Sequence, residues 1–185
     1  LVASSNIIGR TTWDKACAHF IAPESRYYFC NENLRSVFYD GSQWEYEKCN
    51  KYQIAISQAG YPIKGLHKVI EAVALLCNEF PDIKVKVGGE NIFGGNWIKG
   101  NSYGIYIRQL LKKYNLQDQF EFEGFLSAEK MKRLLLESNV FVCPSSIENS
   151  PNSLGEAMIL GVPCVASDVG GISDMLTHNE EGFLY

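Results

Sequence analysis

Two glutamates eight residues apart, Glu148 and Glu156, are the side chains of this 185-residue sequence that are best placed to do chemistry. They lie in the stretch 140–167, where a polar loop and a helical segment separate two apolar runs of strand length. The first turn of a helix offers free backbone N–H groups and a partial positive charge, which suits an anionic ligand. Two carboxylates beside an anion site suit a ligand that also carries hydroxyl groups, such as a sugar.

Helix-boundary signals place the first glutamate in the loop and the second in the helix. Ser150 or Asn152 is predicted to be the N-cap, and Pro151 suits a first-turn position. Gly161 is expected to end the helix, because a glycine just past the last turn readily adopts a left-handed conformation. The flanking apolar runs, 140–143 and 162–166, are then buried strands.

From Tyr52 onward the chain alternates between strand-like and helix-like patterns. The other predicted strands are 52–57, 83–87, 120–122 and 182–184, and the other predicted helices are 66–79, 103–114, 127–137 and 172–176. This alternation is typical of the α/β class. We expect a doubly wound, Rossmann-like parallel sheet of about six strands with helices on both faces.

The order of strands in such a sheet predicts where a ligand binds. In the usual doubly wound fold the order of the strands reverses between the first and the fourth strand, which lie side by side. Ligands bind beyond the carboxyl ends of these two strands. The first strand is followed by the loop that holds Lys64, and the fourth by the loop that holds Glu148. The two loops are therefore predicted to meet at one site.

The first 50 residues are less regular. A short helix is predicted at 12–18, a strand at 27–30 and a further helix at 31–39. Arg10 and Asp14 are interpreted as surface charges, with a role in an active cleft as the alternative.

The motifs around the two acids resemble the donor-site signature of retaining nucleotide-sugar glycosyltransferases of family four, also called glycosyl transferases group 1, which have the two-domain GT-B fold. The resemblance rests on Glu148, Glu156-Ala157-Met158, Gly161-Val162-Pro163 and the turn from Ser167 to Gly171. It implies that residues 51–185 are the C-terminal, nucleotide-sugar-binding domain. Residues 1–50 would then be the tail of the N-terminal domain and the interdomain linker, in a chain that is a fragment of a longer enzyme.

The same resemblance implies a role for each site residue. Glu148 is expected beside the reacting carbon as the catalytic residue, and Glu156 is expected to bind the ribose. Lys64 and Gly65 are expected to bind the donor diphosphate. The remaining residues expected to contact the donor are Asn149, Ser150, Ser153 and Leu154.

Two departures from the family pattern concern this site. Many members have Glu-Gly-Phe-Gly where this chain has Glu148-Asn149-Ser150-Pro151, and Ala59 stands where the family's Gly-Arg-x-x-x-x-Lys-Gly element has its arginine. The expected diphosphate site therefore lacks one cation, and a cation from elsewhere in the chain is a possible replacement.

The resemblance implies a retaining hexosyltransferase that uses a UDP- or GDP-linked sugar and a saccharide or lipid-linked acceptor, in polysaccharide or glycoconjugate synthesis. No metal or cofactor is expected, and the fragment is expected to be inactive alone. Two alternatives remain open: a sugar-nucleotide epimerase of the same architecture, and a non-catalytic nucleotide-binding or interaction module.

Composition narrows the class of protein further. A net charge of −4 argues against a dedicated nucleic-acid binder. The six cysteines form no C-x-x-C motif, and Cys77, Cys143 and Cys164 lie in apolar patterns typical of reduced core thiols, which indicates a cytoplasmic protein. No apolar run is long enough to span a membrane. The resemblance implies that any membrane contact is peripheral, at the inner face, and made through the missing N-terminal domain.

Overall fold

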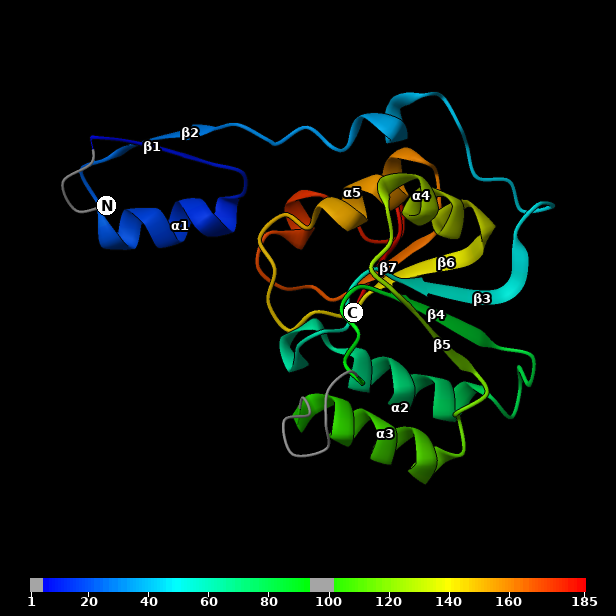
Figure 1. The fold of residues 1–185 in the computed structure, drawn as a ribbon. Helices are drawn as coiled ribbons and strands as arrows, with labels where there is room; N and C mark the ends of the chain where they lie inside the picture. Colours follow the sequence, from blue (N-terminus) through cyan, green and yellow to red (C-terminus); the bar gives the residue numbers. More distant parts are fainter. Residues whose placement is uncertain (1–4, 94–101) are drawn as a thin grey trace.

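The computed structural model describes residues 5–93 and 102–185, which form a small β–α–β unit and a larger α/β part (Figure 1). The larger part contains a six-stranded, entirely parallel sheet in the order β5-β4-β3-β6-β7-β8. Its strands are β3 (Asn50–Ile56), β4 (Lys84–Gly88), β5 (Phe120–Gly124), β6 (Ser138–Cys143), β7 (Cys164–Ala166) and β8 (Phe183–Leu184). The predicted doubly wound sheet of about six strands is confirmed, with its first and fourth strands, β3 and β6, side by side.

Helices cover both faces of this sheet (Figure 1). Two of them, α2 (Leu66–Leu76) and α3 (Ser102–Tyr114), lie on one face, and α4 (Ala128–Glu137) and α5 (Asn152–Ile159) lie on the other. Side chains alternate between two cores along a strand. In β3, Ile54 and Ile56 join the core under α2 and α3, whereas Ala55 joins the core under α4 and α5.

The N-cap residue predicted from the sequence is right for α4 and wrong for α5. Ser127 caps α4 as expected, since its hydroxyl accepts a hydrogen bond from the N–H of Lys130 at 3.3 Å. The predicted cap of α5 is wrong: Pro151 is its N-cap residue and makes no side-chain cap bond. Asn152 is the first helical residue, and its side-chain amide reaches Glu32 instead, at 3.4 Å.

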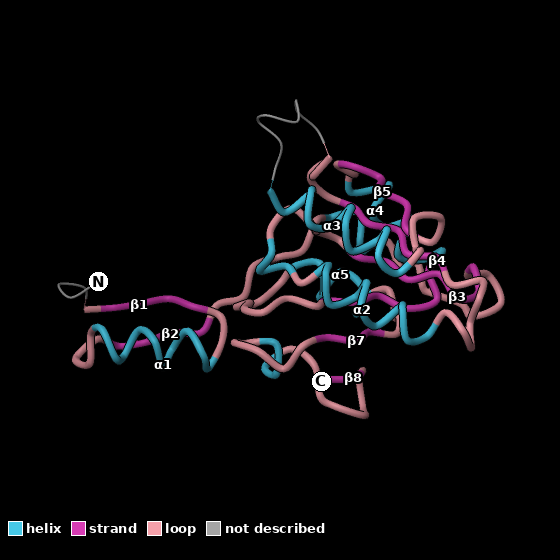
Figure 2. The backbone as a smooth tube through the Cα atoms, turned by 90° about the horizontal axis from the view of Figure 1, so that it is seen from below, coloured by secondary structure: helices cyan, strands magenta, loops and turns pink. Residues whose placement is uncertain are grey.

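The small unit consists of β1 (Asn6–Gly9), α1 (Thr12–Ile21) and β2 (Arg26–Phe29), with the two strands paired in parallel. Figures 1 and 2 show this unit extending to one side of the larger part. The strand β1 was not predicted from the sequence. None of the residues of α1 is fully buried within the described parts of the chain.

The segment between the two parts is mostly extended. The helix predicted at 31–39 is wrong, because only the 3₁₀ turn η1 (Ser36–Tyr39) forms there. Arg35 has an extended backbone conformation, while Phe38 is buried in the core under α4 and α5. Contacts with distant residues therefore decide the conformation of this segment. Two further 3₁₀ turns are η2 (Pro62–Lys64) and η3 (Ile172–Asp174), the latter where a short helix was predicted at 172–176.

The length and polarity of the helices show whether any of them could span a membrane. Within 5–93 and 102–185, every helix is too short or too polar to cross a bilayer.

Candidate functional site

A cavity of about 550 Å³ lies beyond the carboxyl ends of β3 and β6, where the order of the strands reverses. Loops after these strands form part of its wall, and the first turn of α5 forms another part. Residues from the loops after β4 and β5, from α4 and from the N-terminal 35 positions form the rest. The polar and charged lining residues are Arg10, Glu32, Arg35, Ser57, Gln58, Lys64, Ser145, Glu148, Ser150, Asn152, Ser153 and Glu156.

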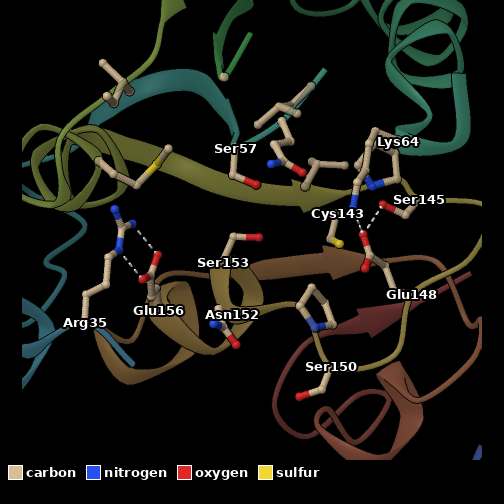
Figure 3. A pocket seen from close by; sticks show the side chains of 18 of the residues that line it. Arg35, Ser57, Lys64, Cys143, Ser145, Glu148, Ser150, Asn152, Ser153 and Glu156 are labelled. Carbon is tan, nitrogen blue, oxygen red and sulfur yellow. Dashed lines mark hydrogen bonds and ion pairs between the residues drawn. The ribbon is translucent and has the colours of Figure 1, made fainter. Parts of the chain in front are cut away.

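At one end of the cavity Lys64 forms an ion pair with Glu148, as the strand order predicted (Figure 3). The hydroxyl of Ser145 donates a second hydrogen bond to the same carboxylate oxygen, at 2.9 Å. The side chains of Lys64 and Glu148 are only 23% and 15% exposed. Because a partly buried pair is less screened by water than a surface pair, this contact holds both side chains at the cavity wall.

Close backbone contacts explain how the two loops meet. The N–H of Ser146 donates to the carbonyl oxygen of Ile63 at 2.8 Å, which joins the loop after β6 to η2. Gly65 has a φ of +73°, and a Cβ atom there would lie 1.8 Å from the carbonyl oxygen of Pro144. Only glycine fits this position, so the Lys-Gly pair allows Lys64 to approach Glu148.

A second glycine contact holds the Glu148 loop from its other side. The N–H of Gly171 donates to the carbonyl oxygen of Glu148 at 3.1 Å. A Cβ atom at Gly170, whose φ is +58°, would lie 1.8 Å from that same oxygen. The turn from Ser167 to Gly171 therefore supports the backbone of the predicted catalytic residue.

At the other end of the cavity Glu156 is paired with Arg35 (Figure 3). Arg35 donates from Nε to Oε1 and from Nη2 to Oε2, both at 2.7 Å, so the pair is bidentate. The carboxylate is 3% exposed, and its hydrogen bonds raise the pKa of Arg35 above the ordinary value. Each carboxylate oxygen has a second lone pair, so Glu156 can still accept a hydrogen bond from a ligand hydroxyl.

Arg35 was missed from the sequence. It stands in a stretch that was predicted to be helical, and its partner is 121 positions away. The Arg in Asn33-Leu34-Arg35 carries no local signal that would indicate this contact.

The remaining predicted residues lie in different surroundings. Ser150 and Ser153 line the cavity, the latter in the first turn of α5. Gly65, Asn149 and Leu154 do not line it: Leu154 is fully buried, and its N–H donates to the carbonyl oxygen of Pro151 at 3.0 Å. The side-chain amide of Asn149 contacts the start of α1 instead.

Arg10 and Asp14 are not ordinary surface charges. Arg10 lines the cavity. Burial raises the pKa of Asp14, but hydrogen bonds to the carboxylate lower it by more, so the pKa is below its ordinary value. The donors are the backbone N–H groups of Arg10 and Thr11 and the side chains of Tyr27 and Asn149.

The chemistry of the lining side chains limits what the cavity can do. Burial raises the pKa of the Cys143 thiol to about 11, so this residue is protonated at neutral pH and is not a thiolate nucleophile. Among the described residues, no three His, Cys, Asp or Glu side chains gather as a metal site would require. The cavity instead offers acids for hydroxyl groups, and cations and helix N–H groups for an anion.

Comparison with known proteins decides the family. Residues 43–185 match the sequence profile of the family described as glycosyl transferases group 1. The chain belongs to this family. The resemblance drawn from the motifs around Glu148 and Glu156 is confirmed at that level.

Individual relatives in the family match part of the chain. The putative colanic acid biosynthesis glycosyltransferase WcaL of Escherichia coli K12 is 30% identical over 127 residues, which is 65% of this chain and 29% of that protein. The 2-deoxystreptamine N-acetyl-D-glucosaminyltransferase of Niallia circulans is 37% identical over 78 residues, which is 42% of this chain and 20% of that protein. The matched parts thus span less than a third of these relatives.

Solved structures show the fold of this glycosyl transferase group 1 chain. Anabaena Alr3699/HepE, solved in complex with UDP and glucose, superposes with a TM-score of 0.78 at 19% identity, over 98% of this chain and 49% of that one. The C-terminal domain of the group 1 protein LpcC from Francisella tularensis superposes with a TM-score of 0.62 at 23% identity, over 84% of this chain and 75% of that one.

Proposed function

We propose that the cavity is the nucleotide-sugar site of a retaining hexosyltransferase, in which residues 51–185 bind the donor. The observation that carries this proposal is the arrangement of two cation–acid pairs at opposite ends of one cavity, with the first turn of α5 between them (Figure 3). Acids that accept from sugar hydroxyls and groups that bind a diphosphate are thus spaced along a single pocket.

The nucleoside end of the donor is assigned to Glu156. This carboxylate is held by Arg35 and still has lone pairs for the ribose hydroxyls. The diphosphate then lies over the start of α5. The N–H groups of Asn152 and Ser153 are in the first turn there and have no acceptor within the helix, so they can donate to an anion. Lys64 supplies a positive charge beside it.

The reacting sugar is assigned to the end at Glu148. Transfer breaks the bond between the anomeric carbon and a diphosphate oxygen, forms a bond from that carbon to an acceptor hydroxyl oxygen, and passes the hydroxyl proton to the departing diphosphate. Positive charge develops on the anomeric carbon as the diphosphate leaves. A carboxylate fixed beside that carbon stabilises the transition state more than the ground state.

The relatives support the class of donor and product. One relative is named for colanic acid biosynthesis and another for transfer of N-acetyl-D-glucosamine, and the superposed Alr3699/HepE was solved with UDP and glucose. We propose a UDP- or GDP-linked donor and a saccharide or lipid-linked acceptor in polysaccharide or glycoconjugate synthesis. We propose also that the basic side chains and α5 neutralise the diphosphate without a metal ion. Any peripheral contact with the inner face of a membrane is assigned to a domain outside this chain.

Calorimetric titration of the chain with UDP and with GDP tests the donor site. One diphosphate should bind saturably, and Glu156→Gln should weaken the diphosphate and its nucleoside by the same factor, because the ribose is common to both. Glu79→Gln removes an exposed acid outside the cavity and should change neither affinity. Urea unfolding of each variant would confirm that it is folded. Absence of binding, or binding that is insensitive to Glu156→Gln, would overturn the proposal.

Retention and the role of the first 50 residues need a second experiment. We propose that residues 1–50 belong to the acceptor domain and the linker, so this chain alone should bind donor but transfer nothing. A chain that includes a complete N-terminal domain should transfer the sugar with its anomeric configuration retained, as judged by NMR of the product. Efficient transfer by the 185-residue chain, or an inverted product, would contradict this assignment.

A further inference from the structure

The start of α1 is docked on the loop that carries Glu148. The side-chain amide of Asn149 donates to Asp14 Oδ2 at 2.8 Å, and its carbonyl oxygen accepts a hydrogen bond from the hydroxyl of Thr11. Thr11 and Asp14 also form a capping box, in which each side chain binds the backbone N–H of the other residue. The cap of α1 therefore binds both ends of the Asn149 amide.

Two neighbouring contacts show that this docking is close. The hydroxyl of Thr12 lies 2.8 Å from Asp174 Oδ1, and Thr11 is 1% exposed. A Cβ atom at Gly171 would lie 2.3 Å from the Thr11 methyl group. The small β–α–β unit thus contacts the turn that supports Glu148 as well as the loop itself.

The docking places Arg10, the residue before the cap, in the cavity. Its backbone N–H donates to Asp14 at 3.0 Å, which fixes the main chain. Its side chain lines the cavity and is 24% exposed, with Nη1 3.5 Å from the side-chain oxygen of Asn152, the first residue of α5. A guanidinium group thus lies beside the helix end to which the diphosphate is assigned.

The acidic partners of the cavity's cations show which cation is most available to an anion. Three described cations line the cavity, and each has an acidic partner: Arg10 with Glu32, Arg35 with Glu156, and Lys64 with Glu148.

The three pairs differ in how readily they can be exchanged. Glu156 and Glu148 are 3% and 15% exposed, so withdrawing their cations would leave a buried or nearly buried charge unpaired. The partner of Arg10, Glu32, is 62% exposed and joined by a single contact of 3.1 Å. An exposed carboxylate regains its hydration when it is released, so this pair can be exchanged for a ligand at little cost. Ala59, which is 1% exposed, supplies no charge.

We propose that Arg10, held in place by the contact of Asn149 with the cap of α1, is a second diphosphate-binding cation of this site. This inference rests on the proposed donor site. A planar guanidinium group that donates two hydrogen bonds is well matched to phosphate oxygens. The N-terminal segment thus contributes directly to recognition of the donor.

The test compares diphosphate and nucleoside binding in the 185-residue chain by calorimetry, with UDP and GDP as probes and uridine and guanosine as their matched nucleosides. Arg10→Gln should weaken binding of the diphosphate by about tenfold or more and leave nucleoside binding unchanged. Arg10→Lys should bind the diphosphate with intermediate affinity, since it keeps the charge but loses the fork. Arg26→Gln, in an exposed position on β2, removes the same charge from the same unit and should have no effect.

The contact that positions Arg10 is tested by Asn149→Gly. This variant should also weaken diphosphate binding several-fold. Combining it with Arg10→Gln should weaken binding little further, because both changes remove the same interaction, that of Arg10 with the diphosphate. Additive losses would show that Asn149 does not act through Arg10.

The outcomes separate this inference from the donor site itself. Diphosphate binding by Arg10→Gln as tight as that of the original chain would overturn the inference alone. An equal loss for diphosphate and nucleoside would also overturn it, because Arg10 would then act only on the structure. Failure of the original chain to bind either diphosphate would overturn the proposed function and this inference together.

Discussion

Both carboxylate oxygens of Glu156 accept hydrogen bonds from Arg35, a residue 121 positions earlier in the chain. The pair joins α5 to the extended segment that links the two parts of the protein. Since Glu156 is nearly fully buried, the arginine compensates a charge that has little contact with water. The nucleoside end of the proposed donor site is therefore coupled to the position of this segment.

Arg35→Ala should lower the free energy of unfolding by about 1–3 kcal/mol, because Glu156 would be left buried and unpaired while Arg35 itself is half exposed. Urea unfolding would measure this change. Arg133→Ala is the matched control: it removes an exposed arginine that lies 3.9 Å from Glu137, and should cost less than about 0.5 kcal/mol. Equal losses in the two variants would show that burial of Glu156 does not matter.

Lys64→Ala should weaken diphosphate binding by about 1–3 kcal/mol, the range for loss of a charge-assisted hydrogen bond, and should scarcely alter nucleoside binding. A chelator should change neither affinity. Lys68→Ala removes an exposed lysine that is paired with Glu71 on the same helix, α2, and serves as the control. If calorimetry gave the same loss for nucleoside and diphosphate, Lys64 would have a structural role only.

Gly65→Ala should disrupt the site through the backbone. Its Cβ atom would overlap the carbonyl oxygen of Pro144, so the turn that carries Lys64 must move away from Glu148. We expect a loss of stability of more than about 2 kcal/mol and weaker diphosphate binding. Gly124→Ala has a similar positive φ, +68°, but meets no atom within 4 Å, and should cost only about 1 kcal/mol. The difference between the two variants isolates the overlap from the backbone strain.

The two glutamates should differ in their kinetic effects when the complete enzyme is assayed. Glu156→Gln removes binding to a part of the donor that does not react, and should raise the donor KM more than it lowers kcat. Glu148→Gln removes a charge beside the anomeric carbon and should lower kcat. Because Gly170 and Gly171 hold the backbone at Glu148, this substitution should leave the loop in place. A Glu148→Gln enzyme altered in KM alone would reverse the roles assigned here.

The docking of α1 should depend on pH through Asp14. Burial raises the pKa of this carboxyl, but hydrogen bonds to its ionised form outweigh that effect, so the pKa in the folded protein is below its ordinary value of 3.8. A group whose pKa is lowered by folding adds stability above its unfolded pKa and loses it as the pH falls through the folded value. The difference in unfolding free energy between the original chain and Asp14→Asn should therefore be constant near neutral pH and shrink below about pH 4. A difference that stayed constant into acid would show that the ionised carboxylate is not required.

Local patterns in the sequence determined the sheet and the meeting of its two central loops. The alternation of residues in β3, with Ile54 and Ile56 on one face and Ala55 on the other, follows from the geometry of a strand buried on both sides. Because parallel strands place their carboxyl ends at one edge, strand order alone predicted that Lys64 and Glu148 would meet. The glycosyl transferase group 1 family was likewise identified from motifs within one continuous stretch.

Only the tertiary structure decided what surrounds those two residues. Arg35 pairs with Glu156 across 121 positions, and Asn149 joins the cap of α1 across 135 and 138 positions. Arg35 has an extended backbone conformation where a helix was predicted. The side chain of Asn149 contacts the cap of α1 and does not line the cavity. Periodicity and propensity report burial and local conformation, but not which distant side chain a polar group will bind. Such pairings depend on the packing of the whole chain, and they brought Arg10 and Arg35 into the site.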